Sequence, residues 1–493
     1  MVRRYLIPAL LASTMPFGFS NPAIAQNYDI VIHGGRVIDP ETGLDAVRDV
    51  GISGNQIASI STDTLQGKRI IQAQGLVVAP GFIDLHQHGQ SPEDYRLKAF
   101  DGVTTALEME IGRQNVAQFL SERKGHALIN YGATASHPFA RSWAFQAAQA
   151  PDALVPASGP ATDNPASPEQ IKKMEDHLRS ELDAGGLGIG MGIQYTPGAT
   201  RLEIIDMFRV AAARHLPVYT HIRGAGTLEP GSNIESVSEV IAAAAISGAS
   251  LHIVHINSSC QKSAPDCLAM IAGARGQGLD ITTEAYPYTA GMTELNSALF
   301  NPGWREKFDI DYKDVVLPKT GEHLTKQRFD ELRASKAPLS VLLFTNNDAT
   351  VDSVIRNPLV MIASDGLPDH PRNAGTYCRV LARYVREQQS LTMSDAIRKM
   401  SLMPAQVLAD STPDGLKKGR LQVGADADVV VFDPATVSDR STYASPKLPS
   451  TGMKYVLVGG TPVIEDGKLV PNMFPGRPLL GTSYRGNRSQ KSR

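Results

Sequence analysis

Short apolar runs alternate with segments of helical periodicity through the middle of the chain. The apolar runs lie at 82–84, 104–110, 131–136, 188–195, 218–221, 251–255, 281–286 and 360–364. Apolar residues recur at helical spacing at 169–184, 204–214, 234–247 and 394–400. Parallel strands need a crossover connection, which is usually a helix, so this alternation predicts βαβ units and a parallel sheet. Eight such strands predict an α/β fold with a (β/α)8 TIM barrel.

The two ends of the chain have a different, β-rich texture. Near the beginning, Gly, Pro and Asn turn signals break up β-rich runs at 28–38, 50–60 and 69–78. Near the far end, similar runs lie at 427–432, 455–458 and 461–465. We therefore expect one small β-sandwich built from both termini, 26–80 together with 415–480, and a catalytic barrel between them at 81–414.

One long segment, 290–350, interrupts the barrel rhythm with aromatic, charged and Pro-rich pieces such as Asn301-Pro302-Gly303-Trp304. An insertion of this length is commonly an active-site lid, although a simple surface excursion would have the same pattern. The last residues, 481–493, are polar and basic, and we expect them to form a disordered tail.

The first residues have the pattern of an export signal. Arg3 and Arg4 precede an apolar run at 5–19, and Ala23-Ile24-Ala25 matches the small-x-small cleavage rule before Gln26. The run is short and broken by two prolines, so it favours a cleaved signal peptide, 1–25, over a membrane anchor. The sequence thus predicts a periplasmic or secreted protein without a membrane span.

Charge and cysteine content narrow the function classes. The 493 residues carry a net charge of −2 with interspersed charges, which argues against a nucleic-acid partner. Three cysteines are too few for a disulfide scaffold. Cys260 and Cys267 are close enough in sequence to pair, but only their Cα separation decides whether they do.

The strongest chemical signal is a strand that ends in two histidines, His86 and His88, within the run Pro-Gly-Phe-Ile-Asp-Leu-His-Gln-His at 80–88. On a strand, residues i and i+2 point to the same side, so both imidazoles can converge on one cation. Zinc accepts such nitrogen ligands readily. The alternative, a pair of satisfied core histidines, is less favoured because the pair follows the first strand of the barrel.

Three further candidate ligands follow predicted barrel strands. His221 and His255 end apolar runs, and Asp365 follows another run and precedes a glycine. The carboxyl ends of the strands form the catalytic face of TIM barrels. Each residue alone could be a core polar group, but together with the histidine pair they predict a metal site.

These residues resemble the amidohydrolase superfamily, in which an HxH motif, two later histidines and an aspartate hold one or two divalent metals. The chain is most similar to the N-acyl-D-amino acid deacylases from about residue 28 to 475, and least so over 290–350. That resemblance is carried by 80–88, by GVTT at 102–105, THIR at 220–223, YPYTAG at 286–291, SDG at 364–366, HPR at 370–372 and the pattern at 419–434.

The second predicted strand departs from this family pattern. D-aminoacylases have a cysteine after this strand, and many amidohydrolases have a bridging lysine on the fourth, but neither residue is present here. Instead Glu108 and Glu110 point to one side, and a carboxylate can bridge hard or borderline cations. We expect Glu110 to be the ligand or bridge, with Glu108 as the second candidate. A buried ion pair is the alternative. Zinc is the default cation, while manganese, cobalt and iron remain open.

The resemblance implies hydrolysis of an N-acyl-D-amino acid, a small amide with a free carboxylate. Asp365 would act as general base and then acid toward metal-activated water. Tyr195 and Tyr288 are candidates for polarising the carbonyl, although each could simply form a wall. Arg223 and Arg372 resemble the carboxylate-binding positions, because a guanidinium suits bidentate pairing.

Several other functions fit the same residues. A dipeptidase acting on D-residues or a cyclic amidase of the hydantoinase or dihydroorotase kind would fit the same superfamily. A metal-dependent binding protein without turnover is less favoured, since binding alone would not need Asp365 as a base. Relatives commonly have a lysine after the strand-six histidine, whereas this chain has Ile256-Asn257-Ser258-Ser259, which leaves the side-chain preference open. The sequence leaves the oligomeric state open.

Overall fold

The computed structural model describes residues 27–147, 153–335 and 339–485, so the predicted signal peptide lies outside the described residues. Its central element is an eight-stranded parallel sheet with each strand beside its sequence neighbour in the barrel. All eight predicted strands are present. They are β6 (Phe82–Asp84), β7 (Val103–Arg113), β8 (Asn130–Ser136), β9 (Ile189–Gly192), β10 (Val218–His221), β11 (Leu251–Ile253), β12 (Ile281–Ala285) and β17 (Val360–Ile362).

The first and last strands approach each other just beyond their carboxyl ends. The backbone N–H of His88 donates to the carbonyl of Gly366 at 3.0 Å, and that of Gly366 donates to the carbonyl of His86 at 3.1 Å. The sheet is therefore a nearly closed barrel, as predicted, and its seam runs through the HxH motif.

Helices cover the outside of the barrel between the strands. Their ends follow local signals: Ser232 and Glu235 form a capping box at the start of α7 (Asn233–Ser247), and Gly248 ends it with φ +76°. The helices predicted at 169–184 and 204–214 are α5 (Pro168–Asp183) and α6 (Arg201–Ala212). The others are α1 (Pro92–Phe100), α2 (Val116–Arg123), α3 (His137–Ala144), α4 (Pro160–Asp163), α8 (Ile256–Cys260), α9 (Ala264–Gly276), α12 (Asp348–Arg356) and α13 (Arg372–Arg379).

The helix predicted at 394–400 is longer than expected. It starts as α14 (Met393–Ile397), passes through wider π-helical turns at Arg398–Leu402 and continues as α15 (Met403–Ser411). Pro404, which has no N–H to donate, lies directly after the π-helical turns. The pattern predicted the start of this segment correctly but not its length.

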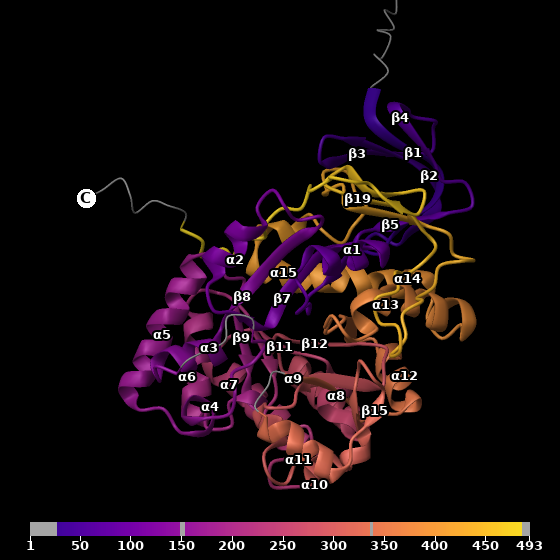
Figure 1. Cartoon of the computed structure of the whole chain (residues 1–493). Helices are drawn as coiled ribbons and strands as arrows, with labels where there is room; N and C mark the ends of the chain where they lie inside the picture. The colour runs from indigo at the N-terminus through magenta and orange to yellow at the C-terminus, as the bar shows by residue number, and fades with distance from the viewer. Residues whose placement is uncertain (1–26, 148–152, 336–338, 486–493) are drawn as a thin grey trace, which may run out of the picture.

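Strands from both ends of the chain share one mixed sheet of nine strands (Figure 1). The predicted small sandwich is thus one hydrogen-bonded sheet, in which β5 pairs with both β1 and β18 and joins the two termini, and β4 branches off by pairing with β1. Apolar side chains of its strands form a separate core. The strands are β1 (Asn27–Asp39), β2 (Leu44–Ser53), β3 (Gln56–Ser61), β4 (Gln66–Gln72), β5 (Val77–Pro80), β18 (Val429–Phe432), β19 (Met453–Val458), β20 (Thr461–Glu465) and β21 (Lys468–Leu469).

The chain then returns to the barrel after this sheet. Tyr131 of β8 donates its N–H to the carbonyl of Arg477 at 3.1 Å and accepts the N–H of Leu479 at 2.7 Å. Arg485 donates its N–H to the carbonyl of Asp183 at 3.1 Å. The predicted disordered tail is therefore too long at its start, because 481–485 are packed on the barrel. The remainder, 486–493, lies outside the described residues.

The segment at 290–350 forms a small α/β unit on the barrel. Its four strands order as β13-β16-β14-β15, and rings of Phe300, Trp304, Tyr312 and Phe329 pack at centroid distances of 5.2 to 5.5 Å. It lies at the opposite end of the molecule from the composite sheet (Figure 1). Its elements are β13 (Ala290–Glu294), α10 (Trp304–Phe308), β14 (Val315–Leu317), β15 (Glu322–His323), α11 (Lys326–Ala334) and β16 (Ser340–Phe344).

Two remaining expectations concern the cysteines and the membrane. Cys260 and Cys267 are joined by a disulfide, which resolves the pairing that sequence alone left open, and Cys378 is a buried free thiol. Within the described ranges, no helix combines the length and apolarity that crossing a bilayer requires.

Candidate metal centre

Four candidate ligands converge where the first, second and last barrel strands end. His86 and His88 follow β6, Glu110 lies near the end of β7, and Asp365 follows β17. All four side chains are at least nine-tenths buried. One ligand atom from each lies within 4.8 Å of the others, which makes a buried His/His/Glu/Asp cluster.

The spacing of these atoms fits a tetrahedral cation site. The Nε2 atom of His86 lies 3.1 Å from Nε2 of His88, 3.0 Å from Oε2 of Glu110 and 3.4 Å from Oδ1 of Asp365. Nε2 of His88 lies 3.0 Å from the Glu110 oxygen and 3.3 Å from the Asp365 oxygen. Zinc ligands at about 2.0 Å from the metal are about 3.3 Å apart in a tetrahedron. The donor atoms therefore suit zinc or a similar divalent cation.

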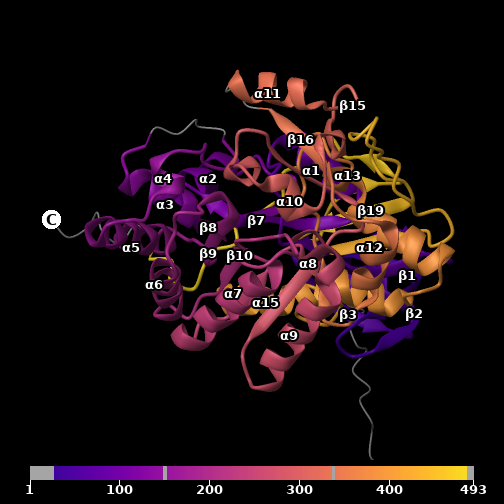
Figure 2. The same ribbon diagram turned by 90° about the horizontal axis from the view of Figure 1, so that it is seen from below.

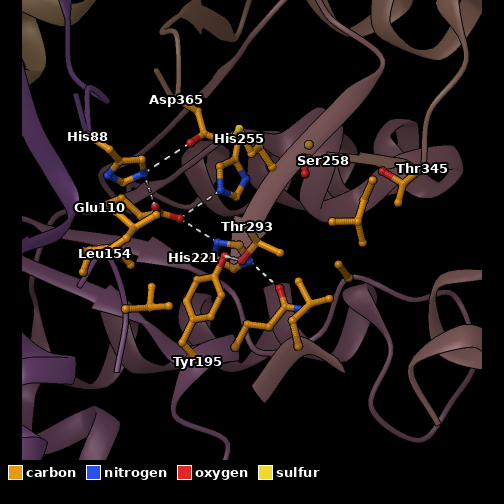
Figure 3. Close-up of a pocket in the computed structure, with 18 of the residues that line it drawn as sticks. His88, Glu110, Leu154, Tyr195, His221, His255, Ser258, Thr293, Thr345 and Asp365 are labelled. Carbon is orange, nitrogen blue, oxygen red and sulfur yellow. Dashed lines mark hydrogen bonds and ion pairs between the residues drawn. The ribbon is translucent and has the colours of Figure 1, made fainter. Parts of the chain in front are cut away.

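A second group shares Glu110 with the first. Its other carboxylate oxygen, Oε1, lies 2.6 Å from Nδ1 of His221 and 3.0 Å from Nε2 of His255. One oxygen of Glu110 thus faces His88 and the other faces His221 and His255 (Figure 3), as the two oxygens of a bridging carboxylate would. This group has three protein ligands, which is the number that leaves a position open in catalytic zinc sites.

Glu108, two residues before Glu110 on β7, contacts the cluster from outside. Oε2 of Glu108 lies 2.8 Å from Nδ1 of His88, on the side of the ring that faces away from the cluster. Glu108 therefore orients a candidate ligand, whereas Glu110 belongs to both ligand groups. Both point to the barrel interior, as residues i and i+2 on a strand must, so the pattern alone did not separate them.

Two supporting residues were missed by the sequence analysis. Oε1 of Glu284, on β12, lies 2.6 Å from Nδ1 of His86, and its Oε2 lies 3.0 Å from Nε2 of His252. Such contacts fix the tautomer of a metal-binding imidazole, with Nε2 facing the ligand cluster. His252 lies within an apolar run, so only its spacing of three before His255 marks it, and this gave no functional signal.

We predict that Glu284→Ala weakens metal binding by about 10- to 100-fold, because His86 loses the partner that orients it. The measurement is the dissociation constant for zinc in competition with a chromogenic chelator. Glu284→Gln keeps one oxygen beside His86 and should give an intermediate constant. Unchanged affinity in a folded Glu284→Ala protein would contradict this role.

Burial and neighbouring charges set the ionisation of the cluster in opposite directions. Burial alone lowers the pKa of His86, but the charges of Glu110, Asp365 and Glu284 outweigh it and raise that pKa to about 10. Burial favours a neutral Glu110, yet the charge of His86 and hydrogen bonds from the other histidines hold its pKa well below the usual range. The carboxylates are therefore ionised while the paired histidines hold protons, and binding of a cation would displace those protons.

Asp365 is paired with a fully buried arginine. Nη2 of Arg372 lies 2.7 Å from Oδ2 of Asp365, but the angle is too skewed for a hydrogen bond, so this is an ionic contact only. Among the described residues, no guanidinium nitrogen of Arg372 has a hydrogen-bond acceptor, and the group lies 4.5 Å above the Tyr286 ring. Buried donors of this kind are costly unless something accepts from them.

The backbone is strained at two candidate ligands. Both Asp365, with φ +48°, and His255, with φ +28°, adopt the left-handed region. A residue other than glycine costs about 1–3 kcal/mol there and is held by its surroundings. Strain of this kind concentrates at functional sites, which supports the same location for the chemistry.

A cavity opens beside the cluster, between the barrel and the 290–350 unit. Among its lining residues are His88, Glu110, His221, His255 and Asp365. Tyr195 lines it as well; its hydroxyl accepts a hydrogen bond from Thr293 at 3.3 Å and points toward the cluster (Figure 3). Residues of the 290–350 unit therefore form part of the cavity wall, and Tyr195 lies in the same cavity as the cluster.

Two predicted site residues lie elsewhere. Arg223 donates to Glu239 at 2.7 and 2.9 Å and to the carbonyl of Ala199 at 2.9 Å, so its charge is paired with a carboxylate of α7. Tyr288 is buried against helix α13, with its hydroxyl 3.5 Å from the carbonyl of Pro371. Neither lines the cavity. Spacing along the chain could not reveal either partner.

A further residue of the cavity wall was not predicted. Oε1 of Gln194 makes a short hydrogen bond with Nε2 of His221, which leaves Nδ1 of that ring facing Glu110. The Nε2 atom of Gln194 is buried with no hydrogen-bond partner within the described part of the chain. Gln194 therefore orients His221 and keeps one donor unused beside the cavity.

Comparison with known proteins agrees with this architecture. Residues 69–464 match the amidohydrolase family. N-acyl-D-glutamate deacylase from Alcaligenes xylosoxydans xylosoxydans is 33% identical, over 92% of this chain and 97% of that protein. D-aminoacylase from the same organism is 30% identical, over 93% and 99%. The crystal structure of N-acyl-D-glutamate deacylase from Bordetella bronchiseptica, complexed with zinc and a phosphonate inhibitor that mimics the tetrahedral intermediate, is 27% identical, with a TM-score of 0.78 over 92% of this chain and 100% of that one. Because the family match spans most of its length, this chain belongs to the amidohydrolase family.

Proposed function

We propose that this protein hydrolyses the amide bond of N-acyl-D-amino acids, with zinc as the metal. The observation that carries the proposal is the shared carboxylate Glu110 between two groups of buried ligands at the mouth of a cavity. The substrate class is supported by the similarity of nearly the whole chain to N-acyl-D-glutamate deacylase and D-aminoacylase. The zinc complex of a related deacylase supports the choice of metal.

The residues of the chain have separate tasks in this proposal. When bound, a divalent cation lowers the pKa of water and polarises a carbonyl group. Asp365 is ionised, because the charges of Arg372 and His86 lower its pKa despite its burial. Its carboxylate can accept the proton of an attacking water and return it to the nitrogen of the leaving amine. The hydroxyl of Tyr195 can donate to the carbonyl oxygen as negative charge develops there.

Arg372 is the residue that we propose as the anchor for the substrate carboxylate. Its guanidinium is buried, contacts Asp365 and has nitrogens without hydrogen-bond acceptors. A planar guanidinium binds a carboxylate with two parallel hydrogen bonds. A substrate carboxylate beside it would satisfy those donors and place the amide near Asp365.

The test is release of amine from matched panels of N-acetyl-D- and N-acetyl-L-amino acids by protein reconstituted with zinc. We expect release from the D-panel, loss of activity after chelation, and recovery when zinc is returned. Metal content and melting temperature are followed in parallel, and both should change with chelation. A zinc-loaded protein that releases no amine from either panel would disprove the deacylase proposal and favour D-dipeptides or cyclic amides as substrates.

A further inference from the structure

Apolar side chains form much of the cavity wall around the ligand cluster. Side chains of Leu154, Val155, Met292, Leu299, Phe308 and Leu343 contribute to it. Some come from the 290–350 unit and others from the segment that follows α3. In Figure 3, Leu154 lies on one side of the cavity, and Ser258 and Thr345 lie on the other. The cavity lining outside the ligand cluster therefore consists of apolar side chains and of neutral polar ones, namely Gln194, Tyr195, Ser258, Gln261, Thr293 and Thr345.

This apolar wall has a fixed shape. Leu343 and Phe308 belong to the same core as Phe300, Trp304 and Phe329, whose rings pack within the inserted unit. β13 and β16 pair along five residues each and hold Met292 beside the cavity. A wall backed by a packed core does not rearrange freely, so its apolar character belongs to the bound state as well.

The charges around the cavity accommodate only one substrate carboxylate. Among the described residues that line it, there is no lysine or arginine, and the charged groups are members of the ligand cluster. Arg372, the proposed anchor of the α-carboxylate, is fully buried beside Asp365 and is not part of the lining, so it offers the cavity no cation for a second carboxylate. Arg223 is held by Glu239, and Lys307, next to Phe308, is not part of the lining.

An acidic amino acid would place a second carboxylate in this cavity. Burial of a charge without a paired cation is strongly unfavourable. An apolar side chain, in contrast, would gain from contact with the leucine and phenylalanine wall. The two effects act in the same direction and discriminate between substrates that differ only in the side chain.

We propose that the cavity selects N-acyl-D-amino acids with apolar side chains, such as leucine, methionine or phenylalanine, over those with acidic side chains. This inference rests on the deacylase function proposed above. It separates the chain from the relative named for N-acyl-D-glutamate, although that protein is similar over nearly its whole length. In this proposal the cavity wall determines which amino-acid side chain is accepted, and the ligand cluster performs the hydrolysis.

The first experiment compares kcat/KM of the zinc-loaded full chain for the N-acetyl derivatives of D-leucine, D-methionine, D-glutamate and D-aspartate. We expect values about 100-fold or more higher for the apolar pair, because the acidic pair must bury an uncompensated charge. Equal or higher values for the acidic pair would overturn the selectivity while leaving the deacylase function in place. No turnover of any D-substrate would overturn the function itself, and this inference with it.

A matched pair of variants tests the physical cause. Ser258 is half-buried in the cavity wall, and it follows the ligand His255 by one helical turn. Ser258→Lys adds a cation there, and Ser258→Met adds a side chain of similar length without charge. We expect the lysine variant to narrow the leucine-to-glutamate ratio by about tenfold through a charge-assisted hydrogen bond, and the methionine variant to keep the ratio.

The two Ser258 variants are compared by their ratio of kcat/KM for the leucine and glutamate derivatives, so the absolute rates do not matter. If both variants narrow the ratio equally, the effect comes from shape and the charge argument fails. If the lysine variant does not fold, inhibition of the wild-type protein by D-leucine and D-glutamate gives the same comparison. Binding of D-glutamate as tight as that of D-leucine would then overturn the inference.

Discussion

Glu110→Ala is expected to reduce metal content below one ion per chain and to lower kcat by about 10³-fold or more. Glu110 contacts candidate ligands of both groups, through Oε2 to His86 and His88 and through Oε1 to His221 and His255. Loss of one bridging side chain therefore weakens both groups at once. A loss of about 4 kcal/mol of transition-state stabilisation corresponds to this factor. Metal content is measured by elemental analysis after dialysis, beside steady-state kinetics.

Two control variants make this prediction specific. Glu110→Cys offers a thiolate, which favours soft cations, so we expect zinc to be retained and manganese to bind more weakly than in the wild type. Glu108→Gln removes a charge from the same strand but keeps a partner for His88, and should have a much smaller effect on metal content. If Glu110→Ala keeps wild-type metal content and affinity, the shared-ligand assignment is wrong.

Asp365→Asn is expected to lower kcat by on the order of 10³-fold, since it removes the proposed proton acceptor and donor. The group of Glu110, His221 and His255 does not contain Asp365. Zinc binding to that group should therefore persist, which separates loss of the base from loss of the metal. A kcat within tenfold of wild type, with one zinc bound, would assign the proton transfers to another residue.

The same substitution has an expected effect on stability. Arg372 is fully buried, and Asp365 is its ion-pair partner. Breaking a buried pair by removing one member costs about 3–5 kcal/mol, because the other charge stays unpaired. We expect the melting temperature of the metal-free Asp365→Asn protein to fall, and Asp365→Asn/Arg372→Met to recover part of that loss. A double variant less stable than the single one would contradict the pairing.

Much of the barrel was predictable because its signals are local. A strand buried on both faces is apolar along its length, and each of the eight runs became a strand of the barrel. The spacing of His86 and His88 fixes their common direction without any knowledge of the rest of the fold. Asp365 and the other histidines were found because they follow strands, and a closed parallel barrel brings all of its strand ends to one face.

Other features had no local signal. The choice between Glu108 and Glu110 depends on where the histidine rings lie, since both carboxylates point inward. Arg223 has the residue type of a carboxylate anchor, yet Glu239 on α7 neutralises it. The extent of the terminal sheet and the packing of 481–485 depend on contacts between opposite ends of the chain.

By itself the sequence determined the strand and helix pattern, the insertion, the composite terminal sheet and the residue types of the metal cluster. Only the tertiary structure decided that Glu110 is shared between two ligand groups, that Glu284 and Gln194 orient His86 and His221, and that the cavity wall is apolar. The physical reason is the separation along the chain of the residues that interact. Periodicity reports which way a side chain points along its own strand or helix, whereas ligand sharing, charge pairing and cavity shape arise where the closed barrel brings distant segments together.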